Sequence, residues 1–270
     1  WSANRAGPRC SRRTRAVNAM PRLFCGRRED AVMDVDAVWK RARADLALHH
    51  SRAEPDTFLW EHSERVARTA QWISGLDELQ TRTLDAAAVV SAALYHDAGW
   101  VTRCRSGELD RLEILLTPSS AAVREDGAAL LESSLRDLLP RRTLERGAEA
   151  VRACGDRSTD VMEAQVVAEA DALEEFNLAS IWLAVRRGAA EGKAVQAHLD
   201  TWRRKREYHY WDARLKDAFR FAATREAAKR RLTVLEEFAN ELDRQHRSVD
   251  LERWGAQASA AHPTTLAPPG

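Results

Sequence analysis

The stretch TLDAAAVVSAALYHDAGW, residues 83–100, decides the fold class of this chain. Apolar and small residues occupy nearly every side of the helix that it predicts, and such a helix lies in the centre of a protein. We expect Gly99 to end this helix. His96 and Asp97 stand near its end, where a buried imidazole or carboxylate needs a partner. The stretch therefore predicts a central helix that carries a polar pair into the core.

The segments on both sides of this helix also repeat apolar residues at the spacing of an α-helix. We expect helices at residues 33–48, 57–76, 117–139, 139–154, 160–188, 199–219 and 224–246, with an irregular connection at about 101–116. Gly75 is placed to end the second of these, and Ser119 or Ser120 to begin the third. No segment alternates as a strand does, and no internal repeat is present. The sequence therefore predicts an all-α protein, built as a single-domain helical bundle.

Composition narrows the class of protein further. The chain is 44% hydrophobic and 31% charged, as is typical of a globular protein, and its net charge of +1 gives no overall field that attracts nucleic acid. No window is apolar for long enough to span a membrane. The four cysteines form no CxxC pair, which argues against a zinc knuckle or a disulfide framework. We therefore expect a cytoplasmic protein without a nucleic-acid or membrane partner.

Residues 1–32 differ from the rest of the chain. The first thirty residues carry eight arginines against two acidic residues, a local charge of +6, and they lack an apolar period. A basic arm for an acidic partner and a transit-type peptide are both open interpretations, but Met33 opens the first patterned helix, which favours a disordered or non-native extension. We expect the bundle to span residues 33–247 and a flexible tail to follow at 248–270.

Four residues of metal-ligand type lie, each in a largely apolar segment, in the order His62, His96, Asp97 and Asp171. Three core helices that each carry such a group favour a common centre. Two imidazoles and two carboxylates suit one divalent ion such as Mn²⁺, Fe²⁺, Co²⁺, Ni²⁺, Zn²⁺ or Mg²⁺. Adjacent residues of a helix point about 100° apart, so His96 and Asp97 must approach the ion from two flanks. A buried polar network without metal is the open alternative.

The order H…HD…D, with HSERVA at the first histidine and ALYHDAG at the pair, resembles the HD-domain family of metal-dependent phosphohydrolases. The resemblance covers roughly residues 35–245. It implies a helical bundle of the HD-domain type around one divalent ion or two. It also implies that His62, His96, Asp97 and Asp171 are metal ligands, with Asp97 in the catalytic centre, and that a metal-activated water hydrolyses a phosphate ester.

Two features differ from common patterns in this family. Dinuclear members carry further histidines between the HD pair and the last aspartate, but residues 98–170 contain none, so we expect one metal ion. Mononuclear nucleotidases carry acidic residues directly after the pair, where this chain has GWV at 99–101. Acidic residues that can supply a proton come later, at Glu108, Asp110 and Glu113. The general acid is therefore unassigned.

Three residues are predicted to contact the substrate. Arg65 lies one turn after the first histidine, where its planar guanidinium can hold a phosphate and take part in catalysis, although a salt bridge to Glu61 or Glu64 explains it equally well. Asp156 and Arg157 belong to the loop GDRST and are predicted to bind substrate, although a loop that caps a helix uses the same residue types.

The segment WRRKREYHYW, residues 202–211, mixes basic and aromatic side chains. Such a segment can stack on and neutralise a nucleotide, with Arg203, Arg204 or Lys205 at the rim of a phosphate site. We favour a half-buried helix with extended arginine stems, which gives the same pattern.

We therefore expect an enzyme, a divalent-metal-dependent phosphohydrolase whose substrate is a small phosphorylated metabolite or nucleotide. The alternative is a metal-dependent module that binds a nucleotide or phosphate without turnover, since no acid directly follows the HD pair. A third hypothesis is a vestigial centre in a scaffold for a partner protein.

Overall fold

The computed structural model of the chain describes residues 34–50, 53–114, 116 and 118–251. The chain divides into two units, Trp1–Met33 and Asp34–Gly270, and the first lies outside the described residues. The expectations for residues 1–32 and for most of the tail at 248–270 therefore concern residues that the structure does not describe.

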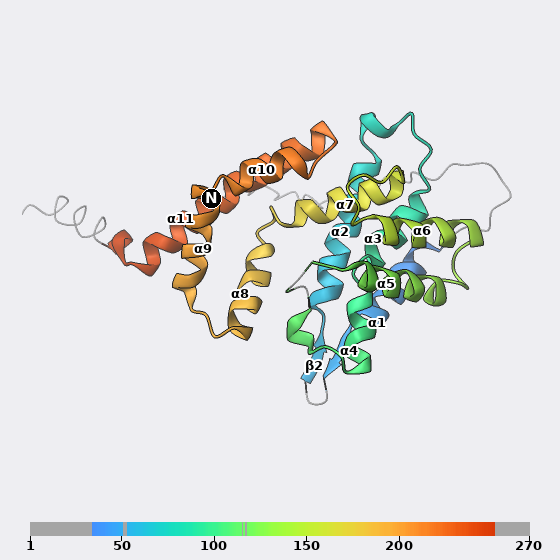
Figure 1. The fold of residues 1–270 in the computed structure, drawn as a ribbon, viewed down its shortest axis with the longest axis horizontal. Coiled ribbons are helices and arrows are strands. Elements are labelled where there is room, and N and C mark those ends of the chain that lie inside the picture. Colours follow the sequence, from blue (N-terminus) through green and yellow to red (C-terminus); the bar gives the residue numbers. More distant parts are fainter. Residues whose placement is uncertain (1–33, 51–52, 115, 117, 252–270) are drawn as a thin grey trace, which may run out of the picture. The chain divides into compact units, whose positions relative to one another are not determined.

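The described residues form eleven α-helices, two single-turn 3₁₀ helices and one short pair of strands (Figure 1). The first elements are α1 Val35–Leu46, β1 Leu48–His50, β2 Ala53–Asp56, α2 Phe58–Ser74, η1 Asp77–Leu79, α3 Ala86–Tyr95, α4 Gly99–Ser106 and η2 Arg111–Glu113. The later elements are α5 Ala121–Ser134, α6 Arg141–Ala153, α7 Met162–Glu174, α8 Ser180–Ala190, α9 Val195–Glu207, α10 Tyr210–Asp217 and α11 Ala222–His246. The predicted all-α class is confirmed, and the one addition is an antiparallel pairing of β1 with β2.

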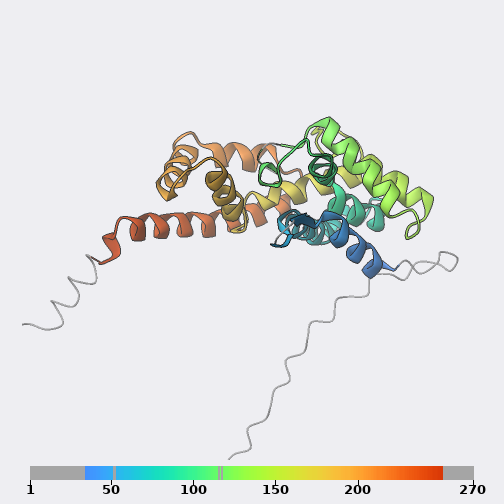
Figure 2. The same ribbon diagram turned by 90° about the horizontal axis from the view of Figure 1, so that it is seen from below.

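Helix α3 lies at the centre of the bundle (Figures 1 and 2). It contacts α1, α2, α5, α6 and α7, and every residue from Ala88 to Tyr95 is buried. Ser91 is the one small polar side chain in this span before the tyrosine, so other helices can cover every face. Asp85 caps the helix by accepting hydrogen bonds from N–H groups of the first turn. The central helix predicted from the sequence is therefore present.

The chain leaves this helix just before the polar pair. α3 ends at Tyr95, residues 96–98 form a turn, and α4 begins at Gly99, so the expectation that Gly99 ends the helix is wrong. A Cβ atom at Gly99 would lie 1.9 Å from the carbonyl oxygen of Val123 in α5. Position 99 therefore needs glycine because α4 and α5 approach each other there, and the connection expected to be irregular begins with a helix.

The helix expected at 160–188 is two helices, because Asn177 interrupts it. Its Oδ1 accepts a hydrogen bond from the N–H of Ala179, and its Nδ2 donates to the Glu174 carboxylate at the end of α7. The basic and aromatic segment further on is likewise interrupted at His209, whose φ of 52° is left-handed, and it forms α9 and α10. Both breaks matter because α8, α9 and α10 line the cavity described below.

The C-terminal helices pack against the end of α7 through a second apolar cluster. Its buried members are Leu173, Phe176, Trp211, Phe219, Ala228 and Leu235. Carboxylates of earlier elements hold the first N–H groups of α11: Glu169 of α7 accepts from Phe221, and Glu78 of η1 accepts from Ala222 and Ala223. None of the described helices is long and apolar enough to cross a membrane.

Candidate metal centre and its cavity

Three elements bring the predicted metal ligands to one place. His62 lies in the first half of α2, Asp171 lies in the last turn of α7, and the pair at 96–97 lies in the turn after α3. The helices α2, α3 and α7 all contact one another. The end of the central helix therefore meets both of its neighbours at the polar pair.

The side chains of these residues converge. The Nε2 atoms of His62 and His96 lie 3.3 Å apart. Oδ2 of Asp97 lies 3.6 Å from the first nitrogen and 3.4 Å from the second, and Oδ1 of Asp171 lies 3.4 Å and 3.7 Å from them. The ligand atoms of His62, His96 and Asp97 all lie within 4.8 Å of one another. His96 and Asp97 are buried, whereas the Asp171 side chain is 49% exposed and lines a cavity.

This donor set fits a divalent cation. Nδ1 of His96 lies 2.8 Å from the carbonyl oxygen of Ala93, which can only accept, so Nδ1 carries a proton and Nε2 is the nitrogen that can bind a cation in place of the second proton. Ligands about 2.1 Å from a metal ion lie roughly 3.0–3.4 Å apart at octahedral or tetrahedral angles. The four measured separations between the imidazoles and carboxylates come close to this range, and the mixture of nitrogen and oxygen is what such ions prefer.

The electrostatics of the centre agree with its geometry. Burial opposes the protonation of His96, but the charges of Asp97 and Asp171 outweigh burial and raise the pKa of His96 to about 9. Desolvation opposes the ionisation of Asp171, but hydrogen bonds to His62 and His96 outweigh it and hold the pKa of Asp171 well below its usual range. The shifts are reciprocal: the carboxylates raise the pKa of His96, and the histidines lower the pKa of Asp171.

Two residues that sequence reasoning missed support the centre. Ser119 donates a hydrogen bond from Oγ to Oδ1 of Asp97, and Arg124 donates from Nη1 to the carbonyl oxygen of Ser119. The sequence suggested Ser119 only as a possible helix cap, and the cap is its neighbour Ser120. No spacing rule connects positions 119 and 124 to the HD pair, because the loop before α5 brings them there.

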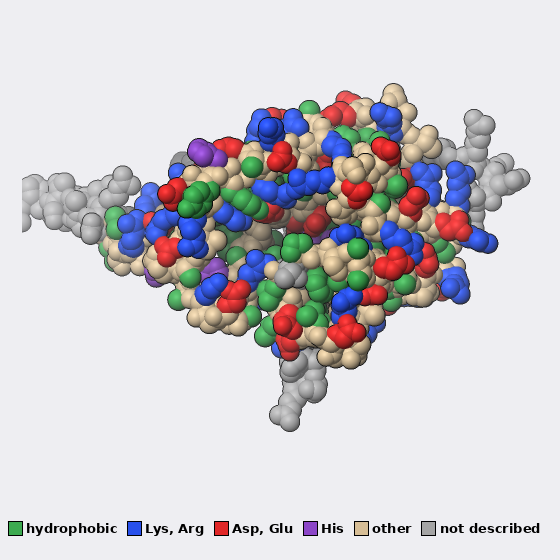
Figure 3. Space-filling view, in the orientation of Figure 1, with side chains coloured by type: hydrophobic (Ala, Val, Ile, Leu, Met, Phe, Trp, Pro, Cys, Tyr) green, Lys and Arg blue, Asp and Glu red, His purple; other side chains and the backbone are tan. Residues whose placement is uncertain are grey.

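The centre lies in the wall of a cavity of about 850 Å³. Basic side chains from six positions line the same cavity: Arg65, Arg124, Arg157, Arg187, Lys205 and Arg214. The surface in Figure 3 is hollowed near its middle, and basic side chains border the hollow. Cations beside a metal centre favour an anionic ligand, and guanidinium groups in particular match the oxygens of a phosphate.

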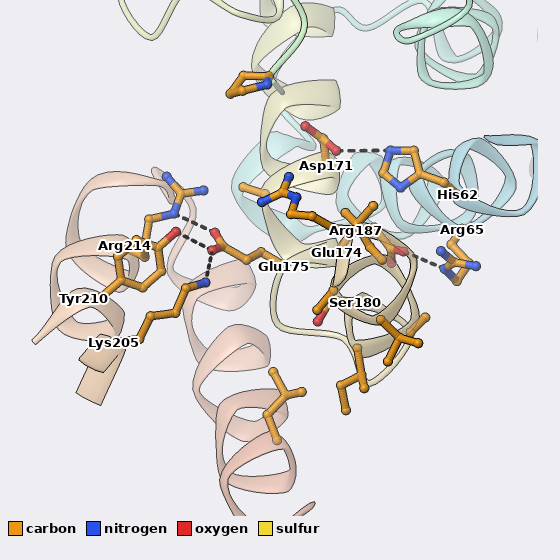
Figure 4. A pocket seen from close by; sticks show the side chains of 18 of the residues that line it. His62, Arg65, Asp171, Glu174, Glu175, Ser180, Arg187, Lys205, Tyr210 and Arg214 are labelled. Atoms are coloured by element: carbon orange, nitrogen blue, oxygen red, sulfur yellow. Dashed lines mark hydrogen bonds and ion pairs between the residues drawn. The ribbon is translucent and has the colours of Figure 1, made fainter. Parts of the chain in front are cut away.

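The predicted substrate residues separate into two groups. Arg65 and Arg157 line the cavity. Nε of Arg65 lies 2.6 Å from Oε2 of Glu174, so its ion pair runs to α7 and not to a neighbour on its own helix (Figure 4). Asp156 accepts hydrogen bonds from the N–H and the hydroxyl of Ser158, and it is not among the residues that line the cavity. Its role as a substrate ligand stays a prediction, as do the roles of the other site residues.

The later acidic residues of the sequence do not reach the cavity. Asp110 and Glu113 cap the 3₁₀ helix η2 through their mutual hydrogen bonds with its backbone, and Glu108 lies 3.9 Å from Arg103. Among the described residues, the carboxylates that line the cavity beside the two aspartates of the centre are Glu174 and Glu175.

Glu175 joins three elements on the side of the cavity away from the metal centre (Figure 4). Its carboxylate accepts hydrogen bonds from the Tyr210 hydroxyl, from Nε of Arg214 at 2.8 Å and from Nζ of Lys205 at 3.4 Å. Nζ of Lys205 also lies 4.3 Å from the centre of the Tyr210 ring and 4.7 Å from that of Trp211. The end of α7 thus holds α9 and α10 in place as a second wall.

The arrangement defines a class of protein: a helical bundle in which a His–Asp pair directly follows the central helix and meets a histidine and an aspartate from two other helices. Residues 59–175 match the family model of the HD domain. The chain therefore contains an HD domain at these residues, and the resemblance noted in its sequence is confirmed there.

Two solved structures are similar to this chain. One is a predicted HD superfamily hydrolase from an uncultured Thermotogales bacterium, with 16% identity and a TM-score of 0.48 over 78% of this chain and 92% of that chain. The other is Bacillus subtilis YpgQ in complex with ADP, with 18% identity and a TM-score of 0.49 over 78% of this chain and 93% of that chain. No curated protein sequence matches the chain.

Proposed function

We propose that this protein is a divalent-metal-dependent phosphohydrolase that acts on a phosphomonoester or a nucleotide. The observation that carries the proposal is the convergence of two imidazoles and two carboxylates in the wall of a cavity lined by basic side chains. The two Nε2 atoms lie 3.3 Å apart, and each lies 3.4–3.7 Å from an oxygen of each carboxylate. The HD domain at residues 59–175 supports it.

In this proposal His62, His96, Asp97 and Asp171 hold one divalent ion. Such an ion, when bound, supplies a water of lowered pKa and offsets the charge of the phosphate. In the reaction, the water oxygen bonds to phosphorus, the bond to the ester oxygen breaks, and the alcohol leaves with a proton while inorganic phosphate remains.

Two of the basic side chains that line the cavity orient the phosphate in this proposal. Arg124 is joined to Asp97 through Ser119 and lines the cavity beside the centre. Glu174 binds Nε of Arg65. This ion pair, and not the flexible stem of the side chain, sets the direction of the other two nitrogens of the guanidinium group. Both guanidinium groups can donate hydrogen bonds to phosphate oxygens, and these bonds are stronger than neutral ones because both partners are charged.

The test is phosphate release by the purified full chain after removal of metal with a chelator. The stripped protein is reloaded separately with Mn²⁺, Fe²⁺, Co²⁺, Ni²⁺, Zn²⁺ or Mg²⁺ and assayed with a panel of phosphomonoesters and nucleotides. We expect release only after metal addition, and loss of release in His96→Ala. The control is His246→Ala, an exposed histidine at the end of α11, which keeps full activity. Full activity of His96→Ala in the presence of chelator contradicts the proposal.

A module that binds a nucleotide or phosphate without turnover is the second candidate. One observation favours it: Glu108, Asp110 and Glu113, the acidic residues considered as candidates for the unassigned general acid, do not line the cavity. Tight binding of a panel member to the metal-loaded chain, with no product after hours of incubation, supports the module and excludes the hydrolase for that ligand.

A further inference from the structure

The cavity extends from the metal centre into a groove between α8, α9 and α11. Six apolar side chains line the groove: Val185 of α8, Leu199 and Trp202 of α9, and Leu235, Phe238 and Leu242 of α11. Within a helix these residues are three, four or seven positions apart, which places each set on one face. We call these six side chains the apolar wall.

The apolar wall is partly open to solvent. Val185 and Phe238 are 43% and 42% exposed, while Leu199 and Leu235 behind them are buried. Apolar surface in a concave site is stabilised when a ligand removes it from water. The cavity volume of about 850 Å³ is also far more than a phosphate group fills, and it lies in the usual range for sites that enclose a whole organic ligand.

The cavity has both charged and uncharged lining. Arg65 follows His62 by one turn of α2 and Arg124 contacts the loop that carries Ser119, whereas Glu175 holds Lys205 and Arg214 in the opposite wall. The six side chains of the apolar wall carry no charge. A ligand that matches both kinds of lining has an anionic group at the metal centre and an apolar group in the groove.

We propose that the substrate is the phosphate monoester of a long aliphatic alcohol, with its alkyl or isoprenyl chain against the apolar wall and its phosphate at the metal centre. This inference rests on the proposed phosphohydrolase function. A nucleobase matches the wall less well, because its ring nitrogens and amino groups lose hydrogen bonds with water when they are buried there. Among the six side chains of the wall, Trp202 has the one hydrogen-bond donor and none has an acceptor, so these bonds are not replaced.

The test compares ethyl, octyl and dodecyl phosphate with adenosine monophosphate, all below the concentration at which micelles form, on the metal-loaded full chain. Each methylene group that reaches the wall is expected to lower KM about fourfold, from the usual transfer free energy of a buried methylene. Adenosine monophosphate is expected to behave like ethyl phosphate. Equal KM values for ethyl and dodecyl phosphate, or a lower KM for the nucleotide than for dodecyl phosphate, overturn the inference.

Two variants on one helix locate the apolar subsite. Phe238→Ser removes an exposed member of the wall and is expected to raise KM for dodecyl phosphate about tenfold or more without changing KM for ethyl phosphate. The control is Val234→Ser, because Val234 is 45% exposed on the same helix but does not line the cavity. The same KM for dodecyl phosphate in both variants overturns the assignment of the wall.

Binding without turnover separates this inference from the function on which it rests. Ethyl and dodecyl phosphate are titrated calorimetrically into His96→Ala, which lacks a predicted metal ligand. Tighter binding of the longer ester there, with no hydrolysis of any ester by the wild-type chain, supports the apolar subsite and contradicts the hydrolase. Hydrolysis of all esters with no dependence on chain length supports the hydrolase and contradicts the subsite.

Discussion

Gly155 leaves the room that the guanidinium group of Arg124 occupies: a Cβ atom at position 155 would lie 2.3 Å from Cζ of this arginine. Arg124 contacts the loop that carries Ser119, whose hydroxyl donates to Asp97. A glycine in the segment after α6 therefore determines where a basic side chain lies beside the metal centre. Since the clash falls on the far end of a flexible side chain, the arginine and not the backbone gives way.

Gly155→Ala is expected to displace Arg124 from its position in the cavity and to weaken binding of inorganic phosphate by about tenfold, the value of one charge-assisted hydrogen bond. The measurement is a calorimetric titration of the metal-loaded chain with phosphate. The control is Gly147→Ala in α6, where a Cβ atom would meet its nearest neighbours at 3.6 Å, an ordinary contact. That variant keeps phosphate affinity and gains helix stability of about 0.5–1 kcal/mol. Unchanged phosphate affinity in Gly155→Ala contradicts the role given to Arg124.

Metal binding is expected to stabilise the fold. An ion at one hundred times its dissociation constant adds about 2.7 kcal/mol to the free energy of unfolding, which for a domain of this size raises Tm by about 5–10 °C. Asp171→Asn should lose most of this rise, whereas Asp156→Asn, a change of an aspartate outside the cavity, should keep it. Thermal unfolding with and without chelator measures the effect. An equal rise in both variants means that Asp171 is not a ligand.

Ser119→Ala and Ser120→Ala should separate metal affinity from fold stability. Ser119 donates to Asp97, and loss of a residue that orients a metal ligand lowers metal affinity by about 10–100-fold. Ser120 accepts from the N–H of Val123 as the cap of α5, and loss of a cap costs about 1 kcal/mol. Competition with a chelator of known affinity and urea unfolding measure the two effects. Equal metal affinities in the two variants contradict the predicted support of Asp97.

The contribution of the ion pair between Asp56 and Arg186 of α8 to the free energy of unfolding should depend on pH. Its carboxylate contacts Arg186 of α8 at 2.7 Å and Arg111 of η2 at 3.4 Å. Burial opposes the ionisation of Asp56, but the hydrogen bond and charge of Arg186 outweigh burial and lower the pKa of Asp56 below 3.8. Because the folded-state pKa is depressed, this stabilisation is present above the unfolded-state pKa and is lost as pH falls through the folded-state pKa.

The measurement is urea unfolding of the wild-type chain and Asp56→Asn between pH 6 and pH 3. The variant is expected to be less stable by about 3–5 kcal/mol at pH 6, because Arg186 is left without its partner in a largely buried place. The difference should shrink towards pH 3. A difference that stays constant over this range shows that the ionised form of Asp56 does not supply the stabilisation.

The four predicted ligands could be found in the sequence because each interrupts an apolar pattern, and a buried polar group needs a partner. The local geometry of the pair His96 and Asp97 could not be predicted from the sequence. In a helix, His96 and Asp97 would point about 100° apart, but they lie in a turn, and both approach Nε2 of His62, at 3.3 Å and 3.6 Å. Directly after the turn, Gly99 packs closely against Val123 of α5, a contact between segments that no sequence pattern connects.

The rest of the cavity depends on breaks that carry no strong sequence signal. The apolar period continues through Asn177, so the segment from α7 to α8 reads as one helix, and the side-chain hydrogen bonds that stop it form only in the folded chain. Lys205 was suggested as a rim residue but not favoured, and it lines the cavity because Glu175 at the end of α7 binds it. The alternative interpretation of Arg65 is an ion pair within its own helix, to Glu61 or Glu64, but its partner Glu174 is 109 positions away.

The end of α7, with the residue that follows it, serves three purposes within five consecutive residues. Asp171 points to the histidines, Glu174 fixes Arg65, and Glu175 holds the opposite wall of the cavity. Their directions are tied together by the helical rotation of about 100° for each residue. Deletion or insertion of one residue within this segment would rotate all the side chains that follow it, so the three contacts could no longer form together. Over evolution, this short segment is therefore expected to accept exchanges of side chains far more readily than any change in its length.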